Sequence, residues 1–240
     1  MIGRGQVAGA AAIAAAFDAG EPIAGVLIVE AGASESARAI AERADALGIP
    51  VFEESAREMR RMRSDESDAD VLAVTGPRAT QDLETLMARD GLVLLLAGLR
   101  YPANVGFLLR SVEVAGAEGV VIDVDWTESV FAEAERISIR AQRFLSVVGA
   151  TAERAVEAAR AAGRRVVAVE TEAGVAPWQV DLTTPALLVL GSETDGIPMP
   201  VLEAADERVR IPVRGFIPSY NVQAAAGIVL GEWLRQTSDT

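Results

Sequence analysis

Residues 91–110 read GLVLLLAGLRYPANVGFLLR, and this stretch decides the fold class. Residues 92–97 are an unbroken apolar run, which is typical of a strand buried on both faces of a parallel sheet. Gly98 follows the run, and residues 103–115 then carry apolar side chains at helical spacing. A buried strand followed closely by a helix predicts the first unit of a doubly wound α/β domain.

The same alternation continues toward the C-terminus. Apolar runs predict further strands at residues 119–122, 165–170, 186–190 and 209–211, and helical periodicity predicts helices at 150–162 and 224–235. We therefore expect residues 91–240 to form an α/β/α domain around one parallel sheet.

A shorter α/β pattern precedes this domain. We expect helices at residues 7–17 and 34–47, strands at 25–30, 49–52 and 71–75, and a polar loop at 64–70. This pattern predicts a compact α/β sandwich over residues 1–78, joined by a linker at 79–90 that includes a short helix.

The Ala-rich run at residues 7–17 superficially resembles a signal peptide. Asp18 and Glu21 follow it at once, so an amphipathic helix is the preferred interpretation. No run approaches the ~20 apolar residues of a membrane span. We expect a cytoplasmic protein without a membrane partner.

The composition excludes several kinds of chemistry. The chain contains no Cys, no His and no Lys, so all 22 cationic side chains are Arg. The absence of Cys and His excludes a thiolate nucleophile and disfavours a tetrahedral zinc site, and the absence of Lys excludes a Schiff base and a complete Walker A loop. The net charge of −13 argues against non-specific coating of nucleic acid, so any RNA site must be a local patch.

Polar residues and glycines follow three of the expected strands, where ligands bind in doubly wound sheets. They lie in residues 101–110, 191–196 and 218–222. Each segment also has a purely structural interpretation. Asn104 could cap a helix beginning near Val105 with Arg110 at the surface, residues 191–196 could form an ordinary glycine turn, and residues 219–221 could be a simple N-cap.

Taken together, the three segments resemble the sequence motifs of the SpoU family of RNA 2′-O-ribose methyltransferases, in the SPOUT superfamily. The first motif has a Pro, an Asn, a Gly and an Arg six residues after the Asn; the second reads Leu-Gly-Ser-Glu-x-x-Gly; the third has Ile-Pro and then Ser-Leu-Asn-Val before a helix. The matching residues are Pro102, Asn104, Gly106 and Arg110, then Leu190, Gly191, Ser192, Glu193 and Gly196, then Ile211, Pro212, Ser219, Tyr220, Asn221 and Val222.

The resemblance covers residues 91–238 and implies the fold, the cofactor and the partners. It implies a trefoil-knotted SPOUT-like domain, S-adenosylmethionine (AdoMet) as cofactor, a tRNA or rRNA substrate, a homodimer and no metal. The first 80 residues resemble, more faintly, the ribosomal-protein-like substrate-binding domain of many members. The small residues of the last helix suit close approach across a two-fold axis, with a tight contact within the chain as the alternative; they are Ala224, Ala225, Ala226, Gly227 and Gly231.

The resemblance also implies residue roles. Arg110 is the residue expected to activate the ribose hydroxyl, either as an unusual base or as a charged donor, and the second role is preferred because guanidinium stays protonated. Glu193 is expected to pair with Arg110. The other residues expected to hold the Arg and the RNA are Asn104, Ser219 and Asn221, and those expected around the cofactor are Gly191, Ser192, Ile211, Tyr220 and Asn221.

The chain departs from the family pattern at several positions. Tyr101 stands where members carry Asp, Tyr220 replaces the Leu of the third motif, residues 136–143 replace a basic, Gly-containing stretch, and a His-Gln-Gly near the end of the first domain is absent. These departures concern the RNA target more than the chemistry. A cationic stripe at near-helical spacing is the expected RNA-binding patch, with a solvated helix face as the alternative; it comprises Arg57, Arg60, Arg61 and Arg63.

The sequence disfavours two other functions. An RNA-binding protein that keeps the fold without catalysis is disfavoured because Arg110, Glu193 and Asn221 are all present. A dinucleotide-binding Rossmann enzyme is disfavoured because no G-x-G-x-x-G follows the first strand of either domain.

Overall fold

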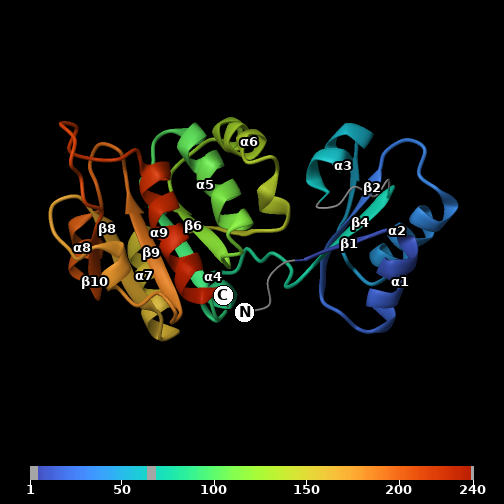
Figure 1. The fold of residues 1–240 in the computed structure, drawn as a ribbon, viewed down its shortest axis with the longest axis horizontal. Helices are drawn as coiled ribbons and strands as arrows, with labels where there is room; N and C mark the ends of the chain where they lie inside the picture. The colour runs from blue at the N-terminus through green and yellow to red at the C-terminus, as the bar shows by residue number, and fades with distance from the viewer. Residues whose placement is uncertain (1–4, 64–68, 239–240) are drawn as a thin grey trace. The chain divides into compact units, whose positions relative to one another are not determined.

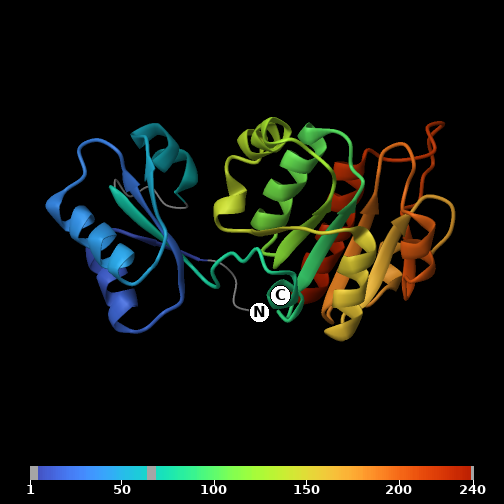
Figure 2. The same cartoon turned by 180° about the vertical axis from the view of Figure 1, so that it is seen from behind.

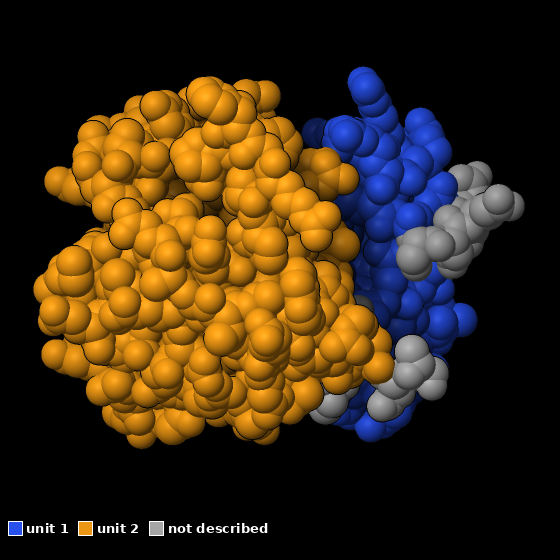
Figure 3. Space-filling view, turned by 60° about the vertical axis from the view of Figure 1, so that its left-hand side comes forward, with its two compact units in different colours: residues 1–79 blue, residues 80–240 orange. Residues whose placement is uncertain are grey.

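A computed structural model describes residues 5–63 and 69–238. The chain divides into two compact units, Met1–Ala79 and Thr80–Thr240. Figure 3 shows the first unit in blue and the second in orange.

The first unit is built on a four-stranded sheet with the order β1-β4-β2-β3. β1 and β2 pair antiparallel with β4, and β3 pairs parallel with β2. Figure 1 shows the elements in chain order, which are β1 (Gln6–Ala8), α1 (Ala10–Asp18), β2 (Ile23–Val29), α2 (Glu35–Ala46), β3 (Val51–Glu54), α3 (Ala56–Met62) and β4 (Val71–Thr75).

Helices α1 and α2 bury their apolar faces against this sheet. Ile13 of α1 and Ile40 of α2 share one core with Val26 and Val71 of the strands. The α/β sandwich predicted for this part of the chain therefore forms. The helix predicted from residue 7 begins later, at Ala10, because residues 6–8 pair with β4 and Gly9 turns the chain with a φ of +85°.

The second unit contains a fully parallel sheet of six strands in the order β10-β8-β9-β5-β6-β7. This is the parallel α/β domain that the apolar runs predict. Its elements are α4 (Leu83–Met87), β5 (Leu92–Ala97), α5 (Pro102–Val114), β6 (Gly119–Asp123), α6 (Glu128–Ile137), η1 (Ala141–Arg143), β7 (Ser146–Gly149), α7 (Ala152–Ala161), β8 (Arg165–Glu170), η2 (Pro177–Gln179), β9 (Ala186–Gly191), α8 (Met199–Glu203), β10 (Glu207–Arg210) and α9 (Val222–Thr237).

Helices cover both faces of this sheet, as Figure 2 shows from behind. Alternate residues of β5 face opposite layers: Leu94 packs with α5 and α9, whereas Leu95 packs with α7. All six β5 residues are therefore buried. This two-sided burial is the physical reason for the unbroken apolar run.

Residues 79–90 do not stand apart as a linker. From Thr80 onward they belong to the second unit, where α4 buries Leu86 and Met87 in the core. The buried guanidinium of Arg164 binds the main-chain oxygens of Met87 at 2.7 Å and Gly91 at 2.6 Å. Burial lowers the pKa of Arg164, but a guanidinium keeps its proton, so Arg164 remains a charged clamp between α4 and the sheet.

In the second unit, helices α6 and α8, strand β7 and the short helices η1 and η2 lie where no element was predicted. The trefoil knot implied by the resemblance stays a prediction.

Candidate active site

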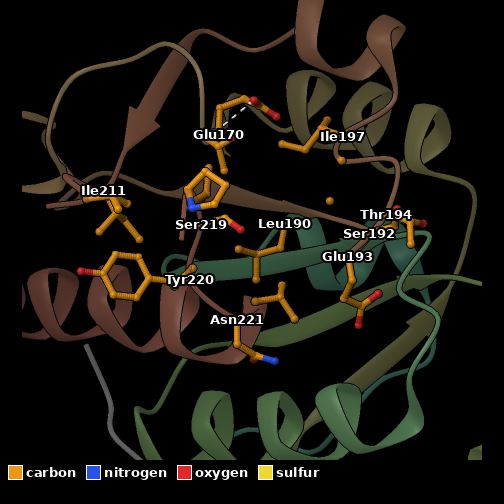
Figure 4. A pocket seen from close by; sticks show the side chains of 18 residues that line it. Glu170, Leu190, Ser192, Glu193, Thr194, Ile197, Ile211, Ser219, Tyr220 and Asn221 are labelled. Atoms are coloured by element: carbon orange, nitrogen blue, oxygen red, sulfur yellow. Dashed lines mark hydrogen bonds between the residues drawn. The ribbon is translucent and has the colours of Figure 1, made fainter. Parts of the chain in front are cut away.

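A pocket of about 460 Å³ lies beyond the carboxyl ends of β8 and β9, beside the first turn of α9. This volume is within the range of small-molecule sites. In the view of Figure 4, Ile211 and Tyr220 lie on one side of the pocket, and Ser192 and Glu193 lie on the other. Every residue predicted to bind the cofactor lines this pocket: Gly191, Ser192, Ile211, Tyr220 and Asn221.

Gly191 permits a tight turn at the end of β9. A Cβ at this position would lie 2.2 Å from the carbonyl carbon of Gly196, so no other residue fits without moving the backbone. The turn is closed by two main-chain hydrogen bonds, from Ser192 N to Gly196 O at 3.0 Å and from Gly196 N to Ser192 O at 3.2 Å. The glycine-turn interpretation is therefore correct for this segment, and the turn also lines the pocket.

Asn104, Glu193 and Asn221 join the three segments in one hydrogen-bonded chain beside the pocket. The amide Nδ2 of Asn104 donates to Oε1 of Glu193 at 2.6 Å, and Nδ2 of Asn221 donates to Oδ1 of Asn104 at 3.4 Å. The main-chain N–H of Arg100 donates to the second carboxylate oxygen of Glu193 at 3.1 Å. We call the set Asn104, Glu193 and Asn221 the amide relay.

The direction of the amide relay is fixed by chemistry. An ionised carboxylate only accepts hydrogen bonds, so Asn104 must turn its NH₂ toward Glu193 and its carbonyl toward Asn221. Asn221 must then donate to Asn104, which leaves its own carbonyl to accept from Gln223 N at 2.9 Å and cap α9. The relay therefore orients both amides and fixes the start of α9.

The interpretation of Asn104 as a helix cap is wrong. α5 begins at Pro102, the N-cap is Tyr101 without a side-chain bond, and Asn104 lies within the first turn with 8% of its surface exposed. The N-cap interpretation of the third segment is correct for Asn221, which serves both α9 and the amide relay.

Arg100 and Asp195 form an exposed ion pair at the same edge, with Nη2 of Arg100 at 2.6 Å from Oδ2 of Asp195. The Thr194 hydroxyl and then Arg100 hold the pKa of Asp195 below its ordinary value. Asp195 N also donates to the Ser192 hydroxyl at 2.9 Å. These contacts order the turn between Gly191 and Gly196.

Arg110 lies on the exposed side of α5 and is not among the pocket-lining residues. The ion pair expected between Arg110 and Glu193 is not formed among the described residues, where Glu193 instead accepts from the Asn104 amide and the Arg100 main-chain N–H, so this pair stays a prediction. Ser219 is exposed and lines the pocket.

Gly106 of the first motif has a packing role. A Cβ there would lie 2.6 Å from the main-chain oxygen of Ala134 and 2.7 Å from Cβ of Ile137. The glycine therefore lets α5 and α6 approach closely, which fixes the helix that carries Asn104 and Arg110.

The expected RNA-binding arginines lie on or beside α3 of the first unit. Arg57, Arg60 and Arg61 are exposed, and Arg63 is the half-buried C-cap residue of the helix. Arg61 makes a long ion pair with Glu58 at 3.5 Å.

Sequence reasoning missed Glu170 and Arg100. Glu170 is the last residue of β8 and lines the pocket, so the rule that strand carboxyl ends form sites could have found it. Arg100 contributes its main-chain N–H, and the type of side chain at a position does not predict such a contact.

The site can bind a ligand that has apolar and polar parts, because Leu190, Ile211 and Val222 line it together with Glu170 and Ser219. Within residues 5–63 and 69–238, no group of three or more acidic side chains is arranged to hold a metal ion. No helix in the described part of the chain is long and apolar enough to cross a membrane.

Comparison with known proteins places these features in a family. The family model described as SpoU rRNA Methylase matches residues 91–231. The chain is 34% identical over 148 residues to the 23S rRNA (guanosine-2′-O-)-methyltransferase RlmB of Pseudomonas syringae, a match covering 61% of this chain and 59% of that protein. It is 31% identical over 203 residues to the RlmB protein of Pseudomonas aeruginosa, with 82% of each chain covered.

A solved structure is similar in fold to this chain. The SpoU methyltransferase AviRb from Streptomyces viridochromogenes, in complex with AdoMet, superposes with a TM-score of 0.59 at 25% identity, covering 98% of this chain and 90% of that one.

Proposed function

The chain belongs to the SpoU rRNA methylase family, and from this premise we propose that it transfers the methyl group of AdoMet to a ribose 2′-hydroxyl of ribosomal RNA. The observation that carries the proposal is the amide relay. It joins residues from three distant segments, 104, 193 and 221, beside one pocket. Relatives named as 23S rRNA 2′-O-methyltransferases support the same activity.

The pocket suits AdoMet. Apolar side chains such as Leu190 and Ile211 offer a surface for an adenine, and the carboxylate of Glu170 and the hydroxyl of Ser219 can bind polar groups. AdoMet, when bound, supplies an electrophilic methyl group on a sulfonium. Gly191, Ser192, Ile211, Tyr220 and Asn221 would hold it, and AviRb, a structural neighbour, was crystallised with this cofactor.

Arg110 would act on the RNA. It is exposed on the helix that also carries Asn104, so an incoming phosphate can reach it. Since a guanidinium keeps its proton, Arg110 would bind a phosphate and stabilise the developing oxyanion as a donor. The amide relay would fix Asn221 and Ser219 toward the ribose by holding the start of α9.

The protein would work as a homodimer that packs through α9. An exposed stripe on this helix combines small and apolar residues, and additional Cβ atoms at Gly227 and Gly231 would meet open space. Such a stripe permits close helix approach across a two-fold axis. Its members are Ala224, Gly227, Ile228, Gly231 and Leu234.

The first unit would bind the RNA substrate through Arg57, Arg60, Arg61 and Arg63. Three of these lie exposed around α3, where they form a local cationic patch in an acidic protein. Action on bacterial rRNA would place the protein in the cytoplasm.

Methyl transfer from tritiated AdoMet into an in-vitro transcript of bacterial 23S rRNA tests the proposal. We expect incorporation by the wild-type protein without added metal and undiminished incorporation in the presence of a chelator. AdoMet binding and RNA binding without incorporation would instead identify a catalytically inactive RNA-binding protein.

A further inference from the structure

Phe216 is the most exposed large apolar residue of the described chain, at 103% of its reference surface, and its neighbour Ile217 is 70% exposed. Both lie in the loop between β10 and α9, together with Arg214 and Gly215. Burial normally stabilises an aromatic ring, so full exposure beside a site suggests a binding role.

The loop stands at the pocket. Val213 and Pro218 both line the pocket. Residues 214–217, which lie between them in the chain, are the part of the loop that does not line the pocket. In Figures 1 and 2 the segment after β10 projects outward from the second unit as a narrow spur. We call residues 214–217 the spur.

The base of the spur is ordered at both ends. Ile211 is 9% exposed and packs in the core, and Asn221 caps α9 and joins the amide relay. The spur is therefore presented by a rigid frame that the proposed reaction also uses.

The segment that carries the spur is cationic. Residues 208–231 contain three arginines and no Asp or Glu, in a protein whose net charge is −13. Arg210 and Arg214 are both exposed. A cation beside an exposed aromatic ring is the combination that binds unpaired nucleotides, because the ring stacks on a base while the cation contacts a phosphate.

The apolar area of the spur is too small for a stable protein interface. Its two apolar side chains, Phe216 and Ile217, fall far short of the roughly 800 Å² that each partner of a stable complex buries. One aromatic ring is sufficient to stack on one base. A base is therefore a better match for the spur than a second copy of the chain.

We propose that the spur binds the RNA substrate next to the target nucleotide, with the Phe216 ring stacked on an unpaired base and Arg214 bound to a neighbouring phosphate. This proposal rests on the proposed RNA methyltransferase function. It adds a docking element in the second unit, separate in the chain from the arginines of α3.

Filter binding and methyl transfer with an in-vitro transcript of bacterial 23S rRNA test the proposal. We expect Phe216→Ala to raise the RNA dissociation constant and the KM for RNA about tenfold, equivalent to about 1.4 kcal/mol. The kcat and the affinity for AdoMet should stay within about twofold of wild type, because the ring is outside the cofactor pocket. Trp178→Ala is the matched control, since Trp178 is another exposed aromatic residue of the same unit, at 60%.

Two further variants separate stacking from general apolar contact. Phe216→Trp should keep wild-type RNA affinity, whereas Phe216→Leu should behave as Phe216→Ala because an aliphatic side chain cannot stack. Arg214→Gln should reduce the slope of log affinity against log salt concentration by about the amount that one phosphate contact contributes. The Phe216 variants should leave that slope unchanged.

Wild-type RNA affinity in Phe216→Ala would overturn the proposal, as would full rescue by Phe216→Leu. Loss of the dimer in Phe216→Ala, measured by sedimentation, would overturn it in favour of a protein contact. Absence of methyl transfer by the wild-type protein would refute the proposed function, and the RNA-binding measurements would then still decide the role of the spur.

Discussion

Replacement of Glu193 by Gln tests the amide relay without changing its shape. The carboxylate accepts from two donors, Asn104 Nδ2 at 2.6 Å and Arg100 N at 3.1 Å. A Gln side chain has one acceptor oxygen and one NH₂, so one of the two donors must face another donor. Asn104 is buried and finds no water in exchange.

The expected loss follows from the bonds removed. A hydrogen bond to a charged group contributes about 1.5–3 kcal/mol to stability. The donor that loses its acceptor forms no other hydrogen bond in its place. We expect Glu193→Gln to lower the free energy of unfolding by about 1.5–3 kcal/mol. Because the relay also fixes the start of α9, methyl transfer should fall about tenfold or more.

Urea denaturation and methyl-transfer kinetics measure the two effects. Asp195→Asn is the matched control, since it neutralises a carboxylate two residues away whose ion pair with Arg100 is exposed and therefore contributes little to stability. A double-mutant cycle with Asn104→Ala should give a coupling energy above about 1 kcal/mol. Equal stability of Glu193→Gln and Asp195→Asn, together with no coupling, would refute the reasoning.

Three further predictions follow from the same structure. Arg110→Ala should keep AdoMet affinity by calorimetry but lose methyl transfer by a factor on the order of a hundred, whereas wild-type turnover would remove Arg110 from the mechanism. Arg60→Glu combined with Arg61→Glu should weaken binding of the 23S rRNA transcript and flatten its salt dependence while AdoMet affinity is unchanged; an unchanged RNA affinity would contradict the assignment of α3. Arg235 and then Gln236 lower the pKa of Glu232 from 4.5 to about 2, so its stabilising effect is present above about pH 4.5 and lost as the pH falls toward 2. Glu232→Gln should therefore be less stable than wild type at pH 7 and closer to it near pH 2, as judged by urea midpoints, and a difference independent of pH would contradict this.

The sequence predicted the second unit well because its strands are buried on both faces. The apolar run at residues 92–97 is followed by similar runs along the chain. This repeated pattern distinguishes the strands from the helices between them. The same signal fails for β7, which has only four residues, whereas α6 carries an apolar face of Val130, Phe131, Ala134 and Ile137 that predicts a helix and was overlooked. In the first unit the Ala-rich run gave no period from which the start of α1 could be read.

The sequence predicted all five of the expected cofactor-binding residues that line the pocket, but not the hydrogen-bond partners of Glu193. Glu193 follows a buried strand, so its position near a ligand could be predicted. Its pairing with Asn104, 89 residues earlier, depends on how β5 and β9 align, and this alignment leaves no local pattern in either segment. The pair predicted between Glu193 and Arg110 likewise depends on tertiary packing, such as that of Gly106 against α6, which leaves no local sequence pattern.

The central claim is that the methyl group is attached to a ribose oxygen of RNA. The most direct measurement is mass spectrometry of nucleosides from a 23S rRNA transcript that has been incubated with the protein and isotopically labelled AdoMet and then digested completely. We expect the label in a 2′-O-methylated nucleoside, with the methyl group retained on the sugar fragment after the glycosidic bond is cleaved. A label on the base fragment, or an unlabelled digest in the presence of bound AdoMet, would contradict the account.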